Sequence, residues 1–402
     1  MMQNYTCLSL NHVVKMSSST DFVFRQLRPL FFSGDAETAH ERMLFLVEMV
    51  SKFPGVIPFL RRQFRKDLPV LHTKLFGKTV NSPIGLAAGF DKDGRIYPAL
   101  FALGFGFVEI GTVTPLPQVG NPKPRIFRLL EDQALVNRLG FNNNGIQKLA
   151  EKLNSVTKVN TPEEAYTLNQ SLEQHEKFSS GMLGGNIGKN RDTSLRRAKE
   201  DYVSLLSALH PFADYFTINI SSPNTEGLQR LQEKQMLREL LESVCSRRDK
   251  LDQNNIRQTP LLIKISADLD DHGLQDCTSV IKEFPIQGVI ATNTTLYRDH
   301  LKSSQKIEQG GLSGKPLKER STEVVRILFK ELGNEVTIIG TGGVFSGADV
   351  YEKIRAGATA VQIYTALIYE GPGLVKRVKQ ELAELLERDE INSVKDVIGI
   401  DS

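Results

Sequence analysis

Residues 337–365 read TIIGTGGVFSGADVYEKIRAGATAVQIYT and contain one complete strand–helix–strand unit. The short apolar runs Thr337–Gly340 and Ala360–Tyr364 have the length and the β-branched content of buried strands. Between them, Gly347–Ala356 follows a helical pattern. Because two strands joined through a helix run parallel, this stretch predicts a βαβ unit of an α/β domain.

The same alternation extends from about residue 80 to the end of the chain. We expect eight strands, at Ile84–Ala88, Phe107–Gly111, Leu183–Ile187, Tyr215–Asn219, Leu261–Ile265, Gly288–Thr292, Thr337–Gly340 and Ala360–Tyr364. Helical patterns follow most of them, for example at Leu231–Cys245 and Thr322–Leu332. Eight such units over roughly 300 residues predict a (β/α)8 TIM barrel. The polar segment 156–180 and the Gly-, Ser- and Lys-rich segment 301–318 are interpreted as inserted loops.

A doubly wound open sheet is the alternative fold, and it would carry a nucleotide-binding fingerprint. Gly104-Phe-Gly106 lies before a strand rather than after one, and no G-x-x-x-x-G-K-[ST] motif is present. These observations favour the barrel.

The amino-terminal part differs from the barrel, which we place at residues 67–402. Residues 1–20 contain no Asp or Glu, which is typical either of a targeting peptide or of a disordered tail. Residues 21–66 are rich in Phe and Leu and predict two or three short helices that are apolar on all sides. Composition alone favours packing of this α-helical lobe against the barrel. The alternative is a hydrophobic lobe that enters a bilayer surface and admits a lipophilic molecule.

The composition of the 402 residues is that of a globular protein, with 40% hydrophobic and 24% charged residues. The net charge of +3 gives no reason to expect a nucleic-acid partner. A small basic cluster at residues 61–66 is interpreted as a solvated helix end, with a membrane-surface contact as the alternative. Three cysteines and seven histidines without metal-ligand spacing predict no metal site. No apolar run reaches the roughly 18 residues that a membrane-spanning helix needs.

Functional residues of such a barrel gather at the carboxyl ends of the strands. Gly342 and Gly343 follow the seventh strand, and Tyr364 and Thr365 follow the eighth, where barrels commonly bind phosphate. A tight turn is the alternative explanation for the glycine pair. Asn and Lys residues collect at the other strand ends, and these side chains suit a heterocycle with amide groups and an anion.

Several long motifs resemble the membrane-associated, quinone-dependent dihydroorotate dehydrogenases, which are flavin enzymes of pyrimidine biosynthesis. The motifs are GLAAGFDK at 85–92, FVEIG at 107–111, NRLGFN at 137–142, NISSPNT at 219–225, TNT at 292–294, GGLSGKP at 310–316 and IIGTGG at 338–343. The resemblance extends from about residue 22 to the end of the chain, and the Phe-rich lobe is itself a feature of this class.

The resemblance implies that FMN is the cofactor and dihydroorotate the substrate. The residues expected at FMN are Ala87, Ala88, Gly89, Gly111, Thr112, Asn137, Asn186, Asn219, Lys264, Thr292, Ser313, Gly314, Gly342, Gly343, Tyr364 and Thr365. The residues expected at dihydroorotate are Lys92, Asn137, Arg138, Leu139, Gly140, Phe141, Asn142, Asn219, Asn224, Asn293 and Thr294.

The resemblance also assigns the catalytic residues. Ser222 matches the base of the quinone-dependent class, whereas the soluble classes use a cysteine. It would take the proton from C5 while a hydride leaves C6 for flavin N5, with Lys92 and Lys264 as the other catalytic residues. Without the motif, a hydroxyl that caps the turn before Pro223 would explain Ser222 equally well.

The second half of the reaction would use a ubiquinone-type quinone. Phe31, His40, Arg128 and Tyr364 match the tunnel positions of the family. The lobe would attach the enzyme peripherally to the mitochondrial inner membrane or, alternatively, to a bacterial cytoplasmic membrane. No nucleic acid and no obligate protein partner are expected.

Three other interpretations remain at this point. A soluble enzyme with fumarate or a nicotinamide as acceptor would have a cysteine base and no Phe-rich extension. A barrel that binds a phosphorylated ligand without redox chemistry would be colourless. A lobe that serves only to dock a partner or a lipid would leave quinone turnover intact when deleted.

Overall fold

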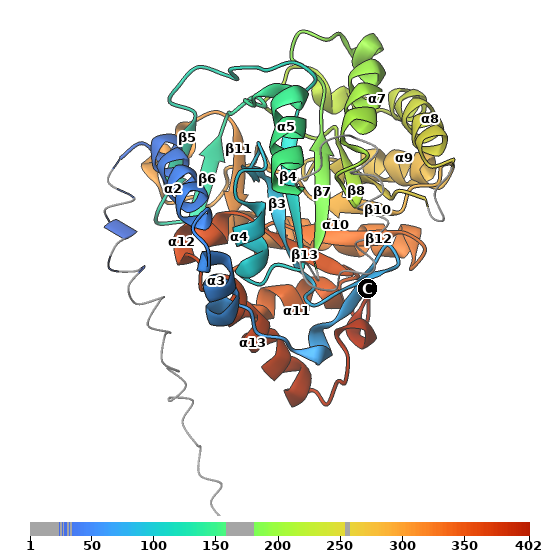
Figure 1. Cartoon of the computed structure of the whole chain (residues 1–402). Coiled ribbons are helices and arrows are strands. Elements are labelled where there is room, and N and C mark those ends of the chain that lie inside the picture. Colours follow the sequence, from blue (N-terminus) through green and yellow to red (C-terminus); the bar gives the residue numbers. More distant parts are fainter. Residues whose placement is uncertain are drawn as a thin grey trace, which may run out of the picture.

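The computed structural model describes residues 34–157, 181–253 and 258–402, together with Phe24, Gln26, Arg28, Pro29 and Phe32. Its centre is a closed barrel of eight parallel strands (Figure 1). Around the barrel these are β3 (Ile84–Asp91), β4 (Phe107–Val113), β7 (Met182–Ile187), β8 (Tyr215–Asn219), β9 (Leu261–Ile265), β10 (Gly288–Ala291), β12 (Thr337–Thr341) and β13 (Ala360–Ile363). Pairing of β13 with β3 closes the barrel. All eight predicted strands and the predicted barrel are therefore confirmed.

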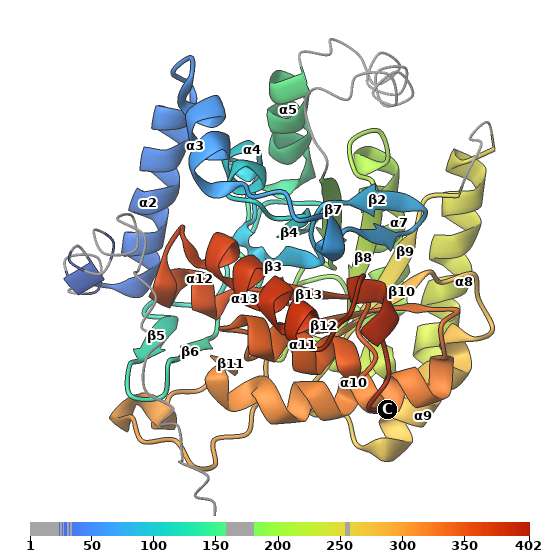
Figure 2. The same ribbon diagram turned by 90° about the horizontal axis from the view of Figure 1, so that it is seen from below.

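Helices surround the barrel, as the view from below shows (Figure 2). They are α4 (Tyr97–Ala102), α5 (Gly145–Thr157), α7 (Ala198–Leu209), α8 (Lys234–Leu251), α9 (Asp271–Ile281), α10 (Lys318–Leu332), α11 (Gly347–Arg355), α12 (Thr365–Glu370) and α13 (Leu374–Arg388). Large side chains such as Phe107 and Tyr215 fill the barrel interior near the amino-terminal ends of the strands. Gly184 makes room for one of them, because a Cβ there would lie 2.3 Å from Cζ of Tyr215.

Two helices of the predicted amino-terminal lobe, α2 (Ala36–Ser51) and α3 (Val56–Phe64), lie at one side of the barrel, beside α12 and α13 (Figures 1 and 2). Asp35 caps α2 by accepting a hydrogen bond from the backbone of Thr38. A buried ion pair between Glu37 and Arg125, 2.6 Å long, ties α2 to the barrel side. Within the described residues no single helix could cross a membrane; only α2 and α3 together have the length and composition, and a bend of 111° separates them.

A small antiparallel sheet lies beside the carboxyl ends of the barrel strands. It consists of β5 (Ile126–Leu129), β6 (Ala134–Asn137) and β11 (Gly311–Gly314), and β11 pairs with β6. The interpretation of 301–318 as a loop was thus wrong, since the segment contains β11 and two short 3-10 helices, Ser304–Ile307 and Lys315–Leu317. Most of the other predicted loop, 156–180, lies outside the described residues. A separate hairpin, β1 (Thr73–Leu75) and β2 (Lys78–Val80), precedes β3.

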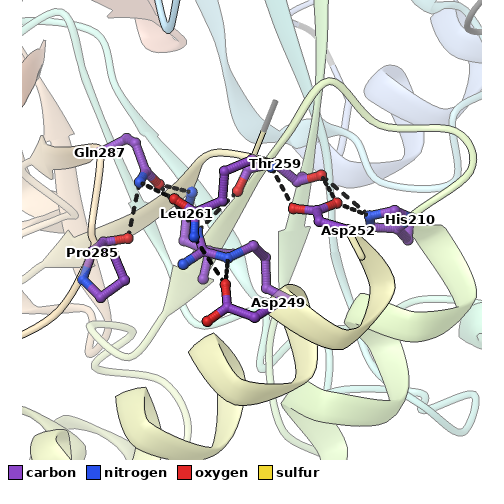
Figure 3. Close-up of polar contacts among 9 residues, drawn as sticks. His210, Asp249, Asp252, Thr259, Leu261, Pro285 and Gln287 are labelled. Carbon is purple, nitrogen blue, oxygen red and sulfur yellow. Dashed lines mark hydrogen bonds and ion pairs between the residues drawn. The ribbon is translucent and has the colours of Figure 1, made fainter. Parts of the chain in front are cut away.

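The opposite, amino-terminal end of the barrel is held by a buried polar network (Figure 3). Asp252, after α8, shares a 2.7 Å hydrogen bond with Nε2 of His210, after α7. It also accepts hydrogen bonds from the backbone N–H and the hydroxyl of Thr259, at 2.6 and 2.8 Å. Thr259 leads into β9, so this network fixes two helix ends to the start of a barrel strand. Interactions at this end of a barrel serve stability rather than chemistry.

Candidate active site

The carboxyl ends of the barrel strands open into one polar cavity. Of the residues expected at cofactor and substrate, those that line it are Ala87, Ala88, Gly89, Lys92, Thr112, Asn137, Leu139, Gly140, Phe141, Asn219, Ser222, Asn224, Lys264, Thr292, Asn293, Thr294, Ser313, Gly314, Gly342, Gly343, Tyr364 and Thr365. Residues far apart in the sequence thus face a common space, as the barrel topology requires.

Four expected residues do not line this cavity. Gly111 and Asn186 lie in the layer beneath it, and Asn186 is fully buried. Asn142 accepts a hydrogen bond from Lys92, so it acts on the cavity through that lysine. Arg138 points away: its guanidinium forms a 2.7 Å ion pair with Glu308 and lies 4.5 Å from the ring centre of Phe127.

The expected site residues did not include several residues that line the cavity, which are Leu317, Thr341, Val344, Phe345, Gln362, Ile363 and Ala366. Gln362 is the most informative of these. It is buried in β13, its Oε1 accepts a hydrogen bond from Thr341, and its Nε2 has no partner among the described residues. A lone amide in an otherwise apolar strand is a signal that could have identified it.

One end of the cavity is built to receive an anion. Gly342 and Gly343 have positive φ angles of 124° and 70°, and a Cβ at Gly343 would lie 2.4 Å from Cα of Lys318. Only glycine therefore fits this turn. The backbone N–H groups of Gly343 and Thr365 make no hydrogen bond within the described parts of the chain. Two unpaired N–H groups beside a glycine turn and a helix start are what a phosphate group binds.

The cavity wall also carries cationic and hydroxyl groups. Lys264 is almost completely buried, and its Nζ has no hydrogen-bond partner among the residues described. Burial lowers the pKa of Lys264, and the negative charge of Glu109 partly offsets this effect. Burial likewise lowers the pKa of Lys92, to about 8. Thr294 also has a buried hydroxyl without a partner in the described structure.

Ser222 and Ser221 have different surroundings. Ser221 is fully buried; its hydroxyl accepts a hydrogen bond from Asn293, at 3.0 Å, and donates one to Asn219, at 3.3 Å. Ser222 faces the cavity, and its Oγ accepts the backbone N–H of Asn224 at 3.3 Å. Its hydroxyl proton is donated to no acceptor in the described structure. Ser222 is therefore the serine that can act on a ligand in the cavity.

A second cavity, of about 430 Å³, lies between the α2–α3 pair and the barrel. Its wall is mostly apolar, with side chains such as Phe32, Met43 and Leu367. Three of the four expected tunnel residues line it, namely His40, Arg128 and Tyr364, whereas Phe31 lies outside the described residues. This volume is within the range of pockets that bind small organic ligands.

Few polar groups line this apolar cavity, and hydrogen bonds to the backbone fix their positions. His40 shares a 2.8 Å hydrogen bond with the carbonyl of Phe90, and burial lowers its pKa. A carbonyl only accepts, so Nε2 of His40 carries the proton and Nδ1 of the neutral ring is an acceptor. The Arg128 guanidinium lies 4.7 Å from the ring centre of Phe32 and donates to the carbonyl of Gly34 at 2.9 Å.

The two cavities share a wall. Asn137, Leu139, Ser313 and Tyr364 line both of them. A lipophilic molecule in one cavity and a polar molecule in the other would thus be separated by single side chains. Fold and site together define a (β/α)8-barrel enzyme with an anion cradle, a polar ligand site and an adjoining apolar ligand site.

Comparison with known proteins identifies the enzyme family to which this chain belongs. The family model described as dihydroorotate dehydrogenase matches residues 70–386, and the chain belongs to this family. Dihydroorotate dehydrogenase (quinone) of Christiangramia forsetii is 43% identical over 89% of this chain and 98% of its own length. The mitochondrial dihydroorotate dehydrogenase (quinone) of Oryza sativa subsp. japonica is 43% identical over 93% of this chain and 79% of its own length.

A solved structure shows the same fold. The Eimeria tenella dihydroorotate dehydrogenase in complex with ferulenol superimposes with a TM-score of 0.82 at 39% identity, covering 94% of this chain and 98% of that one. The family predicted from the motifs is therefore confirmed.

Proposed function

We propose that this chain oxidises dihydroorotate to orotate with FMN as cofactor and passes the electrons to a ubiquinone-type quinone. The wall shared by the two cavities is the observation that carries the proposal. Quinone-type relatives at 43% identity support it. The reaction would serve pyrimidine biosynthesis.

The donor set of the polar cavity fits FMN. The N–H groups of Gly343 and Thr365 would hold the phosphate, and Gly342, Gly314 and Ser313 would lie beside it. Lys264, Thr292 and the Nε2 group of Gln362, which has no partner in the described structure, would contact polar atoms of the ring system, while Ala87, Ala88 and Gly89 would leave room for a planar group. When bound, the flavin supplies a hydride acceptor that can return electrons to a quinone.

The remaining polar side chains would bind and activate the substrate. Lys92 would pair with the carboxylate of dihydroorotate, and the amides of Asn137, Asn219, Asn224 and Asn293 would bind its ring N–H and C=O groups. Ser222 would take the proton from C5. Because no carboxylate or imidazole touches its hydroxyl in the described structure, stabilisation of the developing charge must come from the lysines and amides around it.

The amino-terminal helices would serve the quinone. Six large apolar side chains on or between α2 and α3 are exposed to solvent: Phe45, Leu46, Met49, Val50, Phe53 and Phe59. Apolar side chains exposed in one group are typical of a membrane-contact surface. We propose that this surface rests on a membrane, so that the quinone enters the apolar cavity directly from the lipid. The inner mitochondrial membrane, or alternatively a bacterial cytoplasmic membrane, would be its location.

The test is anaerobic titration of the purified yellow protein with dihydroorotate. Bleaching of the flavin absorbance, followed by its return when a ubiquinone analogue is added, is the expected result. A colourless protein would refute the flavin assignment. A yellow protein that dihydroorotate does not bleach would refute the substrate. Bleaching that a soluble dye reverses but a quinone does not would refute the acceptor.

A further inference from the structure

Glu109 is a buried carboxylate in the barrel interior for which the proposed reaction has no role. It lies on β4 with no exposed surface, one layer below the polar cavity. Three side chains donate to it: Asn186 Nδ2 at 3.0 Å, Thr217 Oγ1 at 2.8 Å and the Tyr215 hydroxyl at 3.3 Å. A buried carboxylate is costly, so its presence beneath the site calls for a reason.

The bond to Asn186 has a fixed direction. A carboxylate only accepts hydrogen bonds, so the amide of Asn186 must turn its Nδ2 toward Glu109 and its Oδ1 toward the cavity. That oxygen accepts hydrogen bonds from Thr112 Oγ1 and, at 3.2 Å, from Asn219 Nδ2. The orientation of the Asn186 amide thereby sets the orientation of the Asn219 amide.

The same constraint continues to the cavity wall. Asn219 turns its Nδ2 toward Asn186 and Thr112, so its Oδ1 faces Ser221 and Asn293. Asn293 Nδ2 donates to Ser221 Oγ at 3.0 Å and approaches Asn219 Oδ1 at 3.5 Å. Asn219 and Asn293 both line the polar cavity. Each amide could rotate by half a turn without a steric cost, and only the hydrogen bonds select one of the two orientations.

We infer that Glu109 is a positioning residue that sets, through Asn186, the direction in which the amides of Asn219 and Asn293 present donors and acceptors to the substrate. The inference rests on the proposed function, because the ligand whose ring amides these side chains would recognise is dihydroorotate or orotate. The negative charge of Glu109 also favours the protonated form of Lys264, against the effect of burial. The carboxylate thus acts on the site in two ways, without touching the ligand.

The Glu109→Leu variant tests the direction of the bonds. It removes the acceptor of Asn186 Nδ2, so this amide regains a partner only by turning Nδ2 toward Thr112 and Asn219. The hydroxyl of Thr112 and the amide of Asn219 can turn to accept it, and the orientation of Asn219 at the cavity is then reversed. We expect the Kd of orotate, followed by the change in flavin absorbance, to rise about tenfold or more. The KM for dihydroorotate should rise with it.

Thr217→Val is the matched control, because it removes one hydrogen bond from Glu109 and leaves the bond to Asn186 intact. It should change the Kd of orotate by less than about threefold. If the Glu109→Leu variant retains its flavin and binds orotate within about threefold of wild type, the inference is wrong. It is also wrong if both variants weaken orotate binding equally, since Glu109 would then be merely structural.

The double variant Glu109→Gln with Asn186→Asp keeps the test decisive even if Glu109→Leu does not fold. It exchanges the amide and the carboxylate, so the buried charge is retained and the new amide at position 109 donates to the new carboxylate at position 186. The second oxygen of that carboxylate still accepts from Thr112 and Asn219. We expect the double variant to bind orotate more tightly than the Glu109→Leu variant or, where that variant does not fold, within about tenfold of wild type.

Two outcomes of this experiment have different meanings. A folded, flavin-containing double variant without orotate binding would overturn the inference about Glu109. A wild-type protein that holds flavin but binds no orotate would overturn the proposed function as well.

Discussion

Lys92 Nζ donates a hydrogen bond to Oδ1 of Asn142, and the two residues come from different parts of the chain, the end of β3 and the segment after β6. The amide positions the amine at the cavity but does not neutralise its charge. Burial lowers the pKa of Lys92 to about 8, from an ordinary value of 10.5. The protonation state of this lysine therefore changes close to physiological pH.

A pH dependence of orotate binding follows. The ligand carboxylate binds the protonated amine, so affinity should be full below about pH 8 and should fall as Lys92 loses its proton above it. The Kd of orotate should rise by up to about tenfold per pH unit there, until the pKa of Lys92 in the complex is reached. Flavin absorbance titrations between about pH 6 and pH 10 measure this dependence. Lys92→Met should bind orotate weakly and with a flat profile; a flat profile in the wild type would exclude Lys92 as the carboxylate partner.

Ser222→Ala should slow flavin reduction by dihydroorotate on the order of 10²- to 10⁴-fold, because the proton at C5 loses its acceptor. Orotate binding should change little, since Ser222 is not among the groups expected to hold the ring. Stopped-flow measurement of flavin bleaching separates the two effects. Rapid bleaching in this variant would mean that another group takes the proton.

Ala39→Trp places a large side chain in the apolar cavity from α2. It should raise the KM for a quinone analogue about tenfold or more, while reduction of the flavin by dihydroorotate stays as in the wild type. Phe45→Trp is a control on the exposed face of the same helix, where 60% of Phe45 is accessible. Equal quinone kinetics in wild type and Ala39→Trp would show that the quinone uses another route.

Asp252→Ala removes the carboxylate that joins His210 and Thr259 at the amino-terminal end of the barrel (Figure 3). Because the partners of a buried charge are left unpaired, we expect a loss of about 3 kcal/mol in the free energy of unfolding. Turnover of the folded enzyme should be unchanged, since the network lies at the end opposite the active site. Glu200→Ala breaks an exposed ion pair at the start of α7 and should leave the free energy of unfolding nearly unchanged in the same denaturation experiment.

The barrel could be predicted because each of its strands is a short local apolar run, and the helices between them have a local period. The strands β6 and β11 could not, since each has only four residues and their pairing joins Asn137 to Gly311, which lie far apart in the sequence. All six residues of the motif at 137–142 were expected at the site. Leu139 does face the cavity, but Arg138 points away from it and forms an ion pair with Glu308. Alternation along an extended backbone separates such neighbours, and a motif alone does not show which of them faces inward. The roles of Ser222 and of the FMN-contacting residues stay predictions.

The wall of Asn137, Leu139, Ser313 and Tyr364 also has an evolutionary consequence. Residues such as Ala36, Met43 and Val47 line only the apolar cavity and take no part in the polar one. Under the proposed function, substitutions there can change which lipophilic compounds the enzyme admits without altering recognition of its metabolite. Selection by a toxic compound in the apolar cavity could therefore produce resistant variants that keep their full affinity for dihydroorotate.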